Sequence, residues 1–286
     1  MRNLTPLANL ETGAMFWAGR DPDDTFAELA ALGLRCGQLG FPGDLDLDAA
    51  VEPWREAIRR SGFVLYTAIA SFHGEDYADI PTVKDTVGFI PPRFRAERVA
   101  RMLAVSDVAA KLAIPGIGMH VGMVPADTTD PDYIAVREIT RQIADHAATH
   151  GQTVSLETGQ ETAEHLLEFL IDVNRSNVGI NFDPANMILY GTGDPIEALG
   201  ILGSRVLSVH AKDGDWPPAD QPDALGTERT LGKGSVGIER FLRKLLQVGY
   251  KGPLAIEREA PNHAERMQDI ATAVRVLDEV KRVILN

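Results

Sequence analysis

Short apolar runs alternate with longer amphipathic stretches along the whole chain. The apolar runs predict buried β-strands. They cover residues 14–17, 35–39, 63–71, 116–121, 153–157, 178–183, 205–211 and 252–257. The stretches between them repeat apolar residues at helical spacing, as Val99, Met102, Leu103 and Ala109 do. The predicted helices cover residues 23–32, 47–61, 93–113, 132–151, 162–173, 195–202, 238–249 and 264–284.

These strand–helix units follow one another without a linker or a break in composition, which predicts a single domain over residues 1–286. Alternating units form a parallel sheet, and eight of them close most naturally into a (β/α)8 TIM barrel. Several helices end at a glycine that leads into the next strand: Gly33, Gly62, Gly151 and Gly252. A doubly wound sheet is the structural alternative. It would need a glycine-rich phosphate loop after its first strand, and GAMFWAGRD at residues 13–21 is not one.

The composition excludes several classes of protein. Hydrophobic content of 44% and charged content of 24% are typical of a soluble globular chain. A net charge of −13 argues against a nucleic-acid partner, because phosphate binding depends on Lys and Arg. The single cysteine, Cys36, fits a reducing compartment, and the first residues lack the apolar core of a secretory leader. No apolar run is long enough to span a membrane. We therefore expect a cytoplasmic protein without a membrane partner.

Asp183 is the last residue of an apolar run, in NFDPANMIL, directly before Pro184. A buried carboxylate without a partner is too costly to persist, so Asp183 requires a counter-charge. Three other predicted strands also end in an ionisable residue, at Glu157, His210 and Glu257. Barrel active sites lie at the carboxyl ends of the strands, so these four side chains predict one site.

Three carboxylates and an imidazole form a mixed oxygen and nitrogen ligand set. We expect Glu157, Asp183, His210 and Glu257 to hold one divalent ion, chosen among Mn²⁺, Co²⁺, Mg²⁺, Fe²⁺ and Zn²⁺. The ion would offset the repulsion of the clustered carboxylates. The alternative is four separate salt-bridged residues at the starts of loops.

Other polar residues lie at the rim of the same opening. His120 ends the fourth strand, where it is either a hydroxyl contact or a satisfied core histidine. Lys212 and Asp213 extend the seventh strand and are candidate substrate contacts. Trp17, Phe72 and Trp216 either pack in the core or form apolar walls beside this opening. The histidines on the helices are expected to be ordinary surface residues: His146, His150, His165 and His263. Loops 72–93, 122–131 and 213–236 would carry the specificity.

The motifs SLETGQE, NFDPANM, SVHAKD and LAIERE, in this order and spacing, resemble those of the xylose-isomerase-like TIM barrels, also called the sugar phosphate isomerase/epimerase family. The loop LGKGSVG before the predicted helix at 238–249 resembles that family too. The resemblance implies that Glu157, Asp183, His210 and Glu257 are metal ligands. It implies that the two glutamates also move protons on opposite faces of the substrate. Asn186 stands where many members have a substrate-contacting histidine, and Glu161 is a plausible hydroxyl contact. The arginine that epimerases carry shortly after the strand-seven histidine is absent.

We therefore expect a metal-dependent isomerase or epimerase that acts on a ketose or related keto sugar through an enediolate. Glu157 and Glu257 would be the catalytic acid and base. A lyase or dehydratase acting on a 3-keto sugar, keto-glycoside or inosose would use the same site. A non-catalytic carbohydrate- or metal-binding protein is a second alternative. A phosphodiester-cleaving endonuclease would need more histidines than the seven in this chain. It would also need a basic surface, whereas the net charge here is −13. The resemblance also implies a homodimer or homotetramer.

Overall fold

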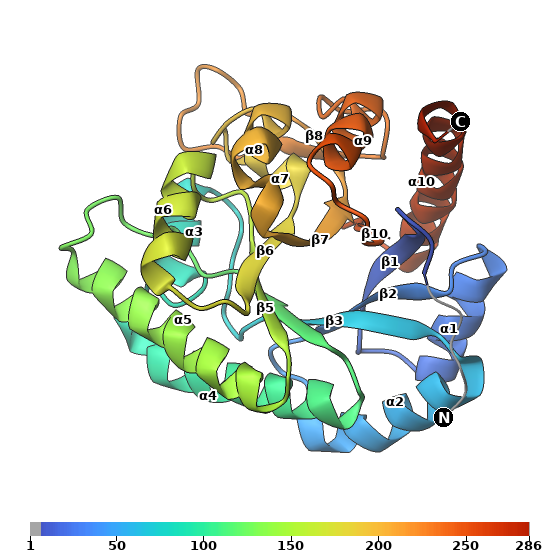
Figure 1. Ribbon diagram of the computed structural model, residues 1–286, viewed down its shortest axis with the longest axis horizontal. Coiled ribbons are helices and arrows are strands. Elements are labelled where there is room, and N and C mark those ends of the chain that lie inside the picture. Colours follow the sequence, from blue (N-terminus) through green and yellow to red (C-terminus); the bar gives the residue numbers. More distant parts are fainter. Residues whose placement is uncertain (1–6, 286) are drawn as a thin grey trace.

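The protein folds as a closed barrel of parallel strands in a ring of helices, as the computed structural model shows for residues 7–285 (Figure 1). The barrel order is β1-β10-β7-β6-β5-β4-β3-β2, and β1 pairs with β10 to close it. Its strands are β1 (Thr12–Trp17), β2 (Cys36–Phe41), β3 (Val64–Ala70), β4 (Gly116–Met119), β5 (Thr153–Glu157), β6 (Val178–Phe182), β7 (Val206–Ala211) and β10 (Leu254–Ile256). The predicted (β/α)8 TIM barrel is confirmed, and the doubly wound sheet is excluded by this closure. Residues 1–6 and 286 of the predicted domain lie outside the described part.

The predicted helices form the outer ring (Figure 1). They are α1 (Pro22–Ala31), α2 (Leu47–Ser61), α4 (Arg95–Lys111), α5 (Pro131–Thr149), α6 (Ala163–Val173), α8 (Pro195–Leu202), α9 (Ile238–Gln247) and α10 (His263–Ile284). Several begin at a side chain that accepts hydrogen bonds from the first free amides, as Asp21, Asp130 and Thr162 do. Local chemistry therefore sets where the helices start.

The core divides into two layers because successive residues of a strand point to opposite faces. Between barrel and helices, Phe16 of β1 packs against Phe26, Trp54 and Phe63. Inside the barrel a smaller apolar cluster contains Met15, Ile69 and Ala255. Other inward positions are polar, and these make the site described below.

Besides the 3-10 helix η2 (Gly203–Arg205) after α8, three sets of elements were not predicted, and these three lie in loops that follow strands. They are α3 (Ile80–Thr86) with the short 3-10 helix η1 (Pro92–Phe94), α7 (Pro184–Leu189), and the hairpin of β8 (Asp213–Asp215) and β9 (Thr227–Arg229). Each is too short to show a clear apolar period. The sixth strand ends at Phe182, and Asp183 instead caps α7 by accepting the N–H of Asn186 at 2.9 Å.

A buried arginine stabilises the loop between β3 and α4. Arg98 donates to the carbonyl of Gly88 and lies over the rings of Phe72 and Phe94. Glu75 accepts the N–H groups of Phe72 and Gly88 at 2.9 Å each. This loop is therefore an ordered wall beside the carboxyl ends of the strands.

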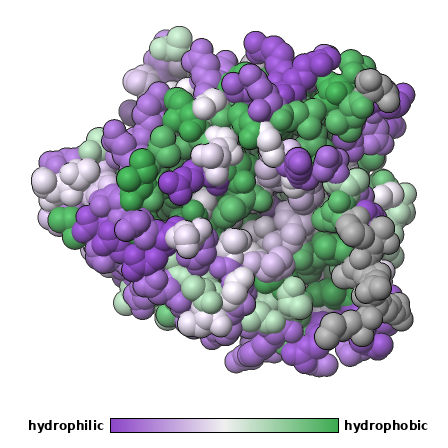
Figure 2. Space-filling view, viewed as in Figure 1, coloured by the Kyte–Doolittle hydropathy of each residue, from purple (hydrophilic) through white to green (hydrophobic). Residues whose placement is uncertain are grey.

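Hydrophilic side chains are spread round the rim of the face shown in Figure 2, and hydrophobic ones lie mostly between them. Within residues 7–285, no helix has both the length and the apolar character needed to cross a bilayer.

Candidate metal centre and substrate cavity

Four strand ends bring Glu157, Asp183, His210 and Glu257 together at the carboxyl end of the barrel. Their potential ligand atoms all lie within 4.8 Å of one another. Nδ1 of His210 is 3.1 Å from Glu157 Oε1, 3.4 Å from Asp183 Oδ2 and 3.2 Å from Glu257 Oε2. The predicted grouping of these four residues therefore exists in the folded chain, and its donor atoms face one point.

The orientation of His210 is set from behind by Gln38. The Nε2–H of His210 donates to Gln38 Oε1 at 2.7 Å, which leaves Nδ1 directed at the carboxylates. Gln38 also donates through Nε2 to Asn181 Oδ1 at 3.1 Å. A hydrogen-bonded partner on the second ring nitrogen is what metal-binding histidines usually have.

Asn181 extends this support to the first glutamate. Its Oδ1 accepts the hydroxyl of Ser208 as well as Gln38, and its Nδ2 donates to Glu157 Oε2 at 3.4 Å. Asn181 and Gln38 are fully buried. A buried polar network inside the barrel thus orients two of the candidate ligands, His210 and Glu157.

Charge balance in the cluster leaves room for a divalent cation. The carboxylates of Glu157 and Asp183 are buried and that of Glu257 is 11% exposed. One ammonium group faces them: Lys212 Nζ lies 2.9 Å from Glu257 Oε2 and 3.7 Å from Asp183 Oδ2. A histidine that binds a metal must be neutral, and with His210 in that form the sum of these charges is −2. Buried charges require compensation, so the donor set and its net charge both fit one divalent ion.

Burial and neighbouring charges shift the pKa values of these groups in opposite directions. Burial raises the pKa of Asp183, which the nearby Lys212 only partly offsets. Burial also acts to raise the pKa of Glu257, but the charges of His210 and Lys212 outweigh it and hold that pKa well below its usual range. Desolvation lowers the pKa of His210, yet Glu257 and Glu157 raise it well above its ordinary value.

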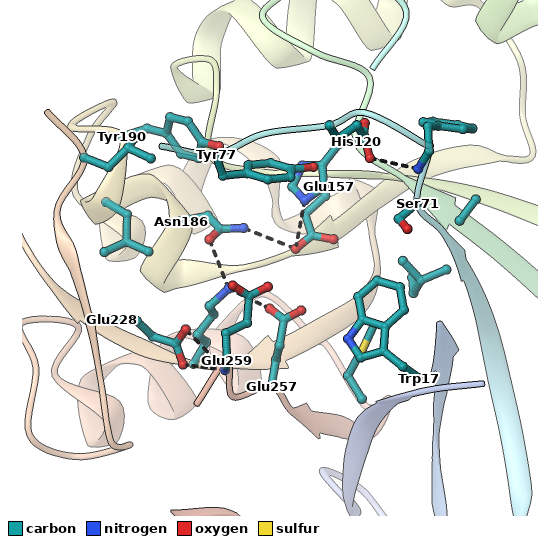
Figure 3. Close-up of a pocket in the computed structure, with 18 of the residues that line it drawn as sticks. Trp17, Ser71, Tyr77, His120, Glu157, Asn186, Tyr190, Glu228, Glu257 and Glu259 are labelled. Carbon is teal, nitrogen blue, oxygen red and sulfur yellow. Dashed lines mark hydrogen bonds and ion pairs between the residues drawn. The ribbon is translucent and has the colours of Figure 1, made fainter. Parts of the chain in front are cut away.

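An open cavity of about 380 Å³ lies over the cluster. Figure 3 shows Glu157, Asn186 and Glu257 projecting into it, with Trp17 and Tyr77 on different sides. Its walls combine apolar, aromatic and acidic side chains. They are Met15, Trp17, Ile69, Ala70, Ser71, Phe72, Glu75, Tyr77, His120, Glu157, Asn186, Leu189, Tyr190, Lys212, Leu225, Gly226, Glu228, Glu257 and Glu259.

Three of the predicted substrate contacts line this cavity: His120, Asn186 and Lys212. Asn186 donates through Nδ2 to Glu157 Oε1 at 3.2 Å, so it also positions that glutamate. His120 Nε2 lies 3.9 Å from Glu157 Oε1, and its buried Nδ1 has no hydrogen-bond partner within the described chain. Of the three aromatic residues considered, Trp17 and Phe72 line the cavity, while Trp216 does not and is 45% exposed.

Glu161 and Asp213 lie behind the cavity walls. Glu161 is buried and accepts the N–H of Val124 at 2.8 Å. Burial raises the pKa of Glu161 to about 8. Asp213 accepts four backbone N–H groups, from Gly214, Gly232, Gly234 and Val236. In this conformation both side chains organise loops, and neither is placed to touch a ligand in the cavity.

Sequence reasoning missed the supporting residues Gln38, Asn181 and Ser208. Two signals were present. Gln38 is the one side chain able to form strong hydrogen bonds in the strand CGQLGF, and Asn181 and Ser208 each stand two residues before a ligand, on the same face of their strands. The aromatic residues Tyr77 and Tyr190 lie in loops, where periodicity carries no such signal.

Replacing Gln38 by Leu will weaken metal binding by roughly 10- to 100-fold, because His210 loses the acceptor that fixes its tautomer and ring. Calorimetric titration of the metal-free protein with Mn²⁺ measures this change. Gln152→Leu is the matched control, since Gln152 is equally buried but bonds to Ser106 and Ile114. Equal affinity in the Gln38→Leu variant and wild type would show that Gln38 does not support the site.

Glu161→Gln will stabilise the fold increasingly as the pH rises from 5 to 8. The folded protein keeps a proton on Glu161 up to about pH 8, whereas the unfolded chain releases it near the ordinary value of 4.5. Wild-type stability therefore falls across this window, by at most about 1.4 kcal/mol per pH unit for this group. Urea midpoints at several pH values measure the difference. Glu164→Gln, an exposed neighbour, should give a constant offset, and a constant offset for Glu161→Gln would contradict the prediction.

The xylose isomerase-like TIM barrel family model matches residues 26–280 of this chain. A crystal structure of a xylose isomerase domain protein from Planctomyces limnophilus is 41% identical, with a TM-score of 0.92 over 97% of this chain and 99% of that one. A curated relative, the uncharacterised protein MJ1311 of Methanocaldococcus jannaschii, is 28% identical over 110 residues. That match covers 38% of this chain and only 35% of the relative.

More distant solved structures share the barrel. A xylose isomerase-like TIM barrel protein from Mycobacterium smegmatis in complex with magnesium is 17% identical, with a TM-score of 0.69 over 97% of this chain and 98% of that one. A D-allulose 3-epimerase from Methylomonas sp. in complex with D-allulose is 18% identical, with a TM-score of 0.68 over 96% of this chain and 97% of that one. The matched family model covers most of the chain, so this protein belongs to the xylose isomerase-like TIM barrel family.

Proposed function

We propose that this protein is a divalent-metal-dependent sugar isomerase or epimerase that acts on a ketose or a related keto sugar. The observation that carries the proposal is the pair Glu157 and Glu257. Both belong to the candidate ligand cluster and both line the cavity, from β5 and from the end of β10 (Figure 3). In the barrel order β7 and β6 stand between these two strands, so the two carboxylates approach a ligand from different directions.

The two glutamates suit a proton transfer in two steps. One carboxylate takes the proton from the carbon beside the substrate carbonyl, and the electron pair of that C–H bond moves onto the carbonyl oxygen to give an enediolate. The other glutamate, protonated, returns a proton. Delivery to the opposite face of the same carbon gives an epimer, and delivery to the former carbonyl carbon gives an aldose–ketose isomer.

Neighbouring side chains prepare the glutamates for this task. Lys212 donates to Glu257 at 2.9 Å, which favours the ionised carboxylate that a base needs. Asn186 donates to Glu157 and holds it at the cavity wall. His120 lines the cavity with Nε2 3.9 Å from Glu157 Oε1, where it could hydrogen-bond a substrate hydroxyl bound beside that glutamate.

Glu157, Asp183, His210 and Glu257 would hold the divalent ion. When bound, it would supply Lewis-acid stabilisation of negative charge on the substrate oxygens, worth several kcal/mol of barrier. Mn²⁺, Co²⁺, Mg²⁺, Fe²⁺ and Zn²⁺ all accept such ligands. The magnesium complex of the Mycobacterium smegmatis relative supports a metal on this fold.

The charge of the cavity favours an uncharged substrate. Within the described chain its lining includes five glutamates, one lysine and no arginine. The lysine is already engaged by Glu257 and lies near Asp183. A phosphate group would meet carboxylates without a free guanidinium to bind it. Trp17 and Phe72 offer apolar surface for the carbon skeleton of a free sugar, and the D-allulose complex of the Methylomonas relative supports a sugar ligand.

Glu157→Gln and Glu257→Gln will each lower turnover by roughly 10²- to 10⁴-fold, because each removes a proton-transfer group. Ketoses and 3-keto sugars incubated with metal-loaded protein in D₂O, followed by NMR, report the reaction through deuterium at the exchanged carbon. Glu138→Gln, an exposed glutamate on α5, is the matched control and should keep full activity.

The same experiment separates the alternatives. Release of water or an aglycone, with an unsaturated product, would replace the isomerase proposal by the lyase or dehydratase. Metal-loaded protein that exchanges no proton on any of these substrates while binding them would favour a non-catalytic binding protein. The cytoplasmic location and the homo-oligomeric state stay predictions.

A further inference from the structure

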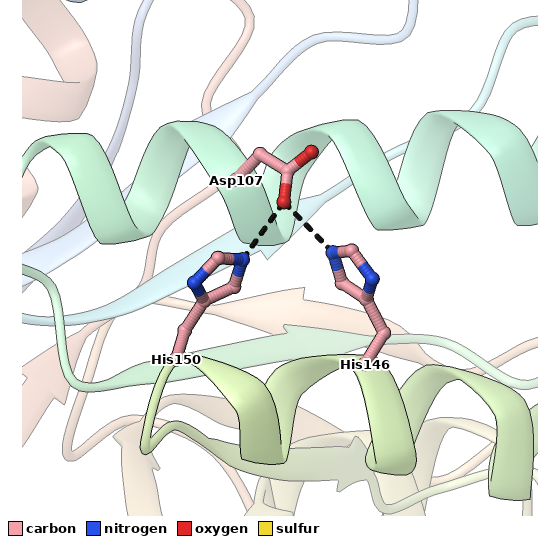
Figure 4. A group of neighbouring side chains, drawn as sticks. All are labelled: Asp107, His146 and His150. Carbon is pink, nitrogen blue, oxygen red and sulfur yellow. Dashed lines mark hydrogen bonds and ion pairs between the residues drawn. The ribbon is translucent and has the colours of Figure 1, made fainter.

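Two helix histidines and an aspartate meet on the outer surface of the barrel, away from the cavity. His146 lies in the last turn of α5 and His150, four residues on, is the C-cap residue of that helix, so the two side chains lie on the same side of it. Asp107 comes from the neighbouring helix α4. Nε2 of each histidine lies 2.8 Å from the same oxygen, Oδ1 of Asp107 (Figure 4). The sequence predicted both histidines as ordinary surface residues. They are partly exposed, but their convergence on Asp107 was not predicted.

The geometry differs from that of a simple surface ion pair. His263 and Glu28 form such a pair at 3.0 Å, although Arg20 adds a donor there. At Asp107 two imidazoles face one carboxylate, and the three ligand atoms lie within 4.8 Å of one another. Ligands at about 2.0–2.1 Å from a tetrahedral zinc ion stand about 3.3 Å apart, so a small outward shift of each side chain admits the ion.

Exposure and packing suit an ion that enters from solvent. The two histidine side chains are each 31% exposed and that of Asp107 is 48% exposed. Water can therefore complete the coordination. The helix backbones fix the spacing of the ligands, and α4 and α5 are held together by buried residues such as Val105, Ile143 and Ala147.

The position within the fold indicates a structural role. Helices of a (β/α)8 barrel run opposite to the strands, so the last turns of α4 and α5 lie at the amino ends of the strands. The candidate catalytic cluster lies at the carboxyl ends. In barrels of this kind the amino-end face serves stability and the other face serves catalysis.

We propose that Asp107, His146 and His150 form a second divalent metal site, which takes a transition metal such as Zn²⁺ and clamps α4 to α5. Two imidazoles and one carboxylate match the ligand preference of Zn²⁺, Ni²⁺ and Cu²⁺ far better than that of Mg²⁺. The proposal is independent of the reaction in the cavity, because it shares no residue with the central cluster.

Calorimetric titration of the chelator-treated full chain with Zn²⁺ tests the site. His210→Ala removes a central ligand and should leave one tight Zn²⁺ per chain at the outer site. Adding His146→Ala and His150→Ala to that variant should weaken the remaining binding by at least about 100-fold. Adding His263→Ala instead is the matched control and should change nothing. Unaltered Zn²⁺ binding after loss of both outer histidines would overturn the proposal.

A second arm avoids any folding defect of the His210→Ala variant. In the otherwise wild-type chain, Asp107→Asn and the double variant His146→Ala/His150→Ala should each reduce tightly bound Zn²⁺ from two per chain to one. Both should also abolish the part of the Zn²⁺-dependent rise in Tm that comes from the outer clamp. The same number of tight Zn²⁺ ions in these variants as in the wild type would contradict the second site.

Discussion

Three carboxylates held together in a buried site are the constraint on which the rest of this structure depends. Asp183 is fully buried and Glu157 is 4% exposed, so water cannot compensate their charge. Lys212 compensates one unit of this negative charge and leaves two. Gln38 holds His210 so that its Nδ1 joins the carboxylate oxygens as a ligand set for a cation that would compensate the other two. Without a cation, Asp183 is the carboxylate that favours protonation, as its raised pKa indicates. The proposed divalent ion would explain why such costly groups are kept inside the barrel.

The barrel geometry lowers the conformational entropy cost of holding these side chains together. Each ligand stands at a strand end, where backbone hydrogen bonds to neighbouring strands already fix its direction. The residues behind the ligands, Gln38 and Asn181, point inward from their own strands and bond to one another across the barrel. Orientation of the site thus follows from strand periodicity and closure, and little flexibility has to be lost when a ligand binds.

Sequence periodicity predicts the barrel well because every unit repeats the same signal. The strand β5 and the helices α2 and α8 fall on their predicted limits. The four strand-end residues were predictable because strand parity and barrel topology alone place them at one edge. The loops were not: α7 and the β8–β9 hairpin are short, and their form depends on caps and tertiary contacts.

The same reason explains why two candidate contacts fall behind the walls. Glu161 and Asp213 follow strand ends, so position along the chain suggested exposure to the cavity. Their partners are backbone amides of distant loops, Val124 in one case and residues 232–236 in the other. Contacts between segments far apart in sequence carry no local pattern. The convergence of Asp107 with His146 and His150 was hidden in the same way.

The most direct test of the metal centre is anomalous diffraction from crystals of the full chain grown with Mn²⁺. We expect one peak among the four central ligands, within roughly 2.5 Å of His210 Nδ1 and of an oxygen from each of Glu157, Asp183 and Glu257. A map that shows no peak there, with Lys212 still bonded to Glu257 and His210 turned from the carboxylates, would contradict it.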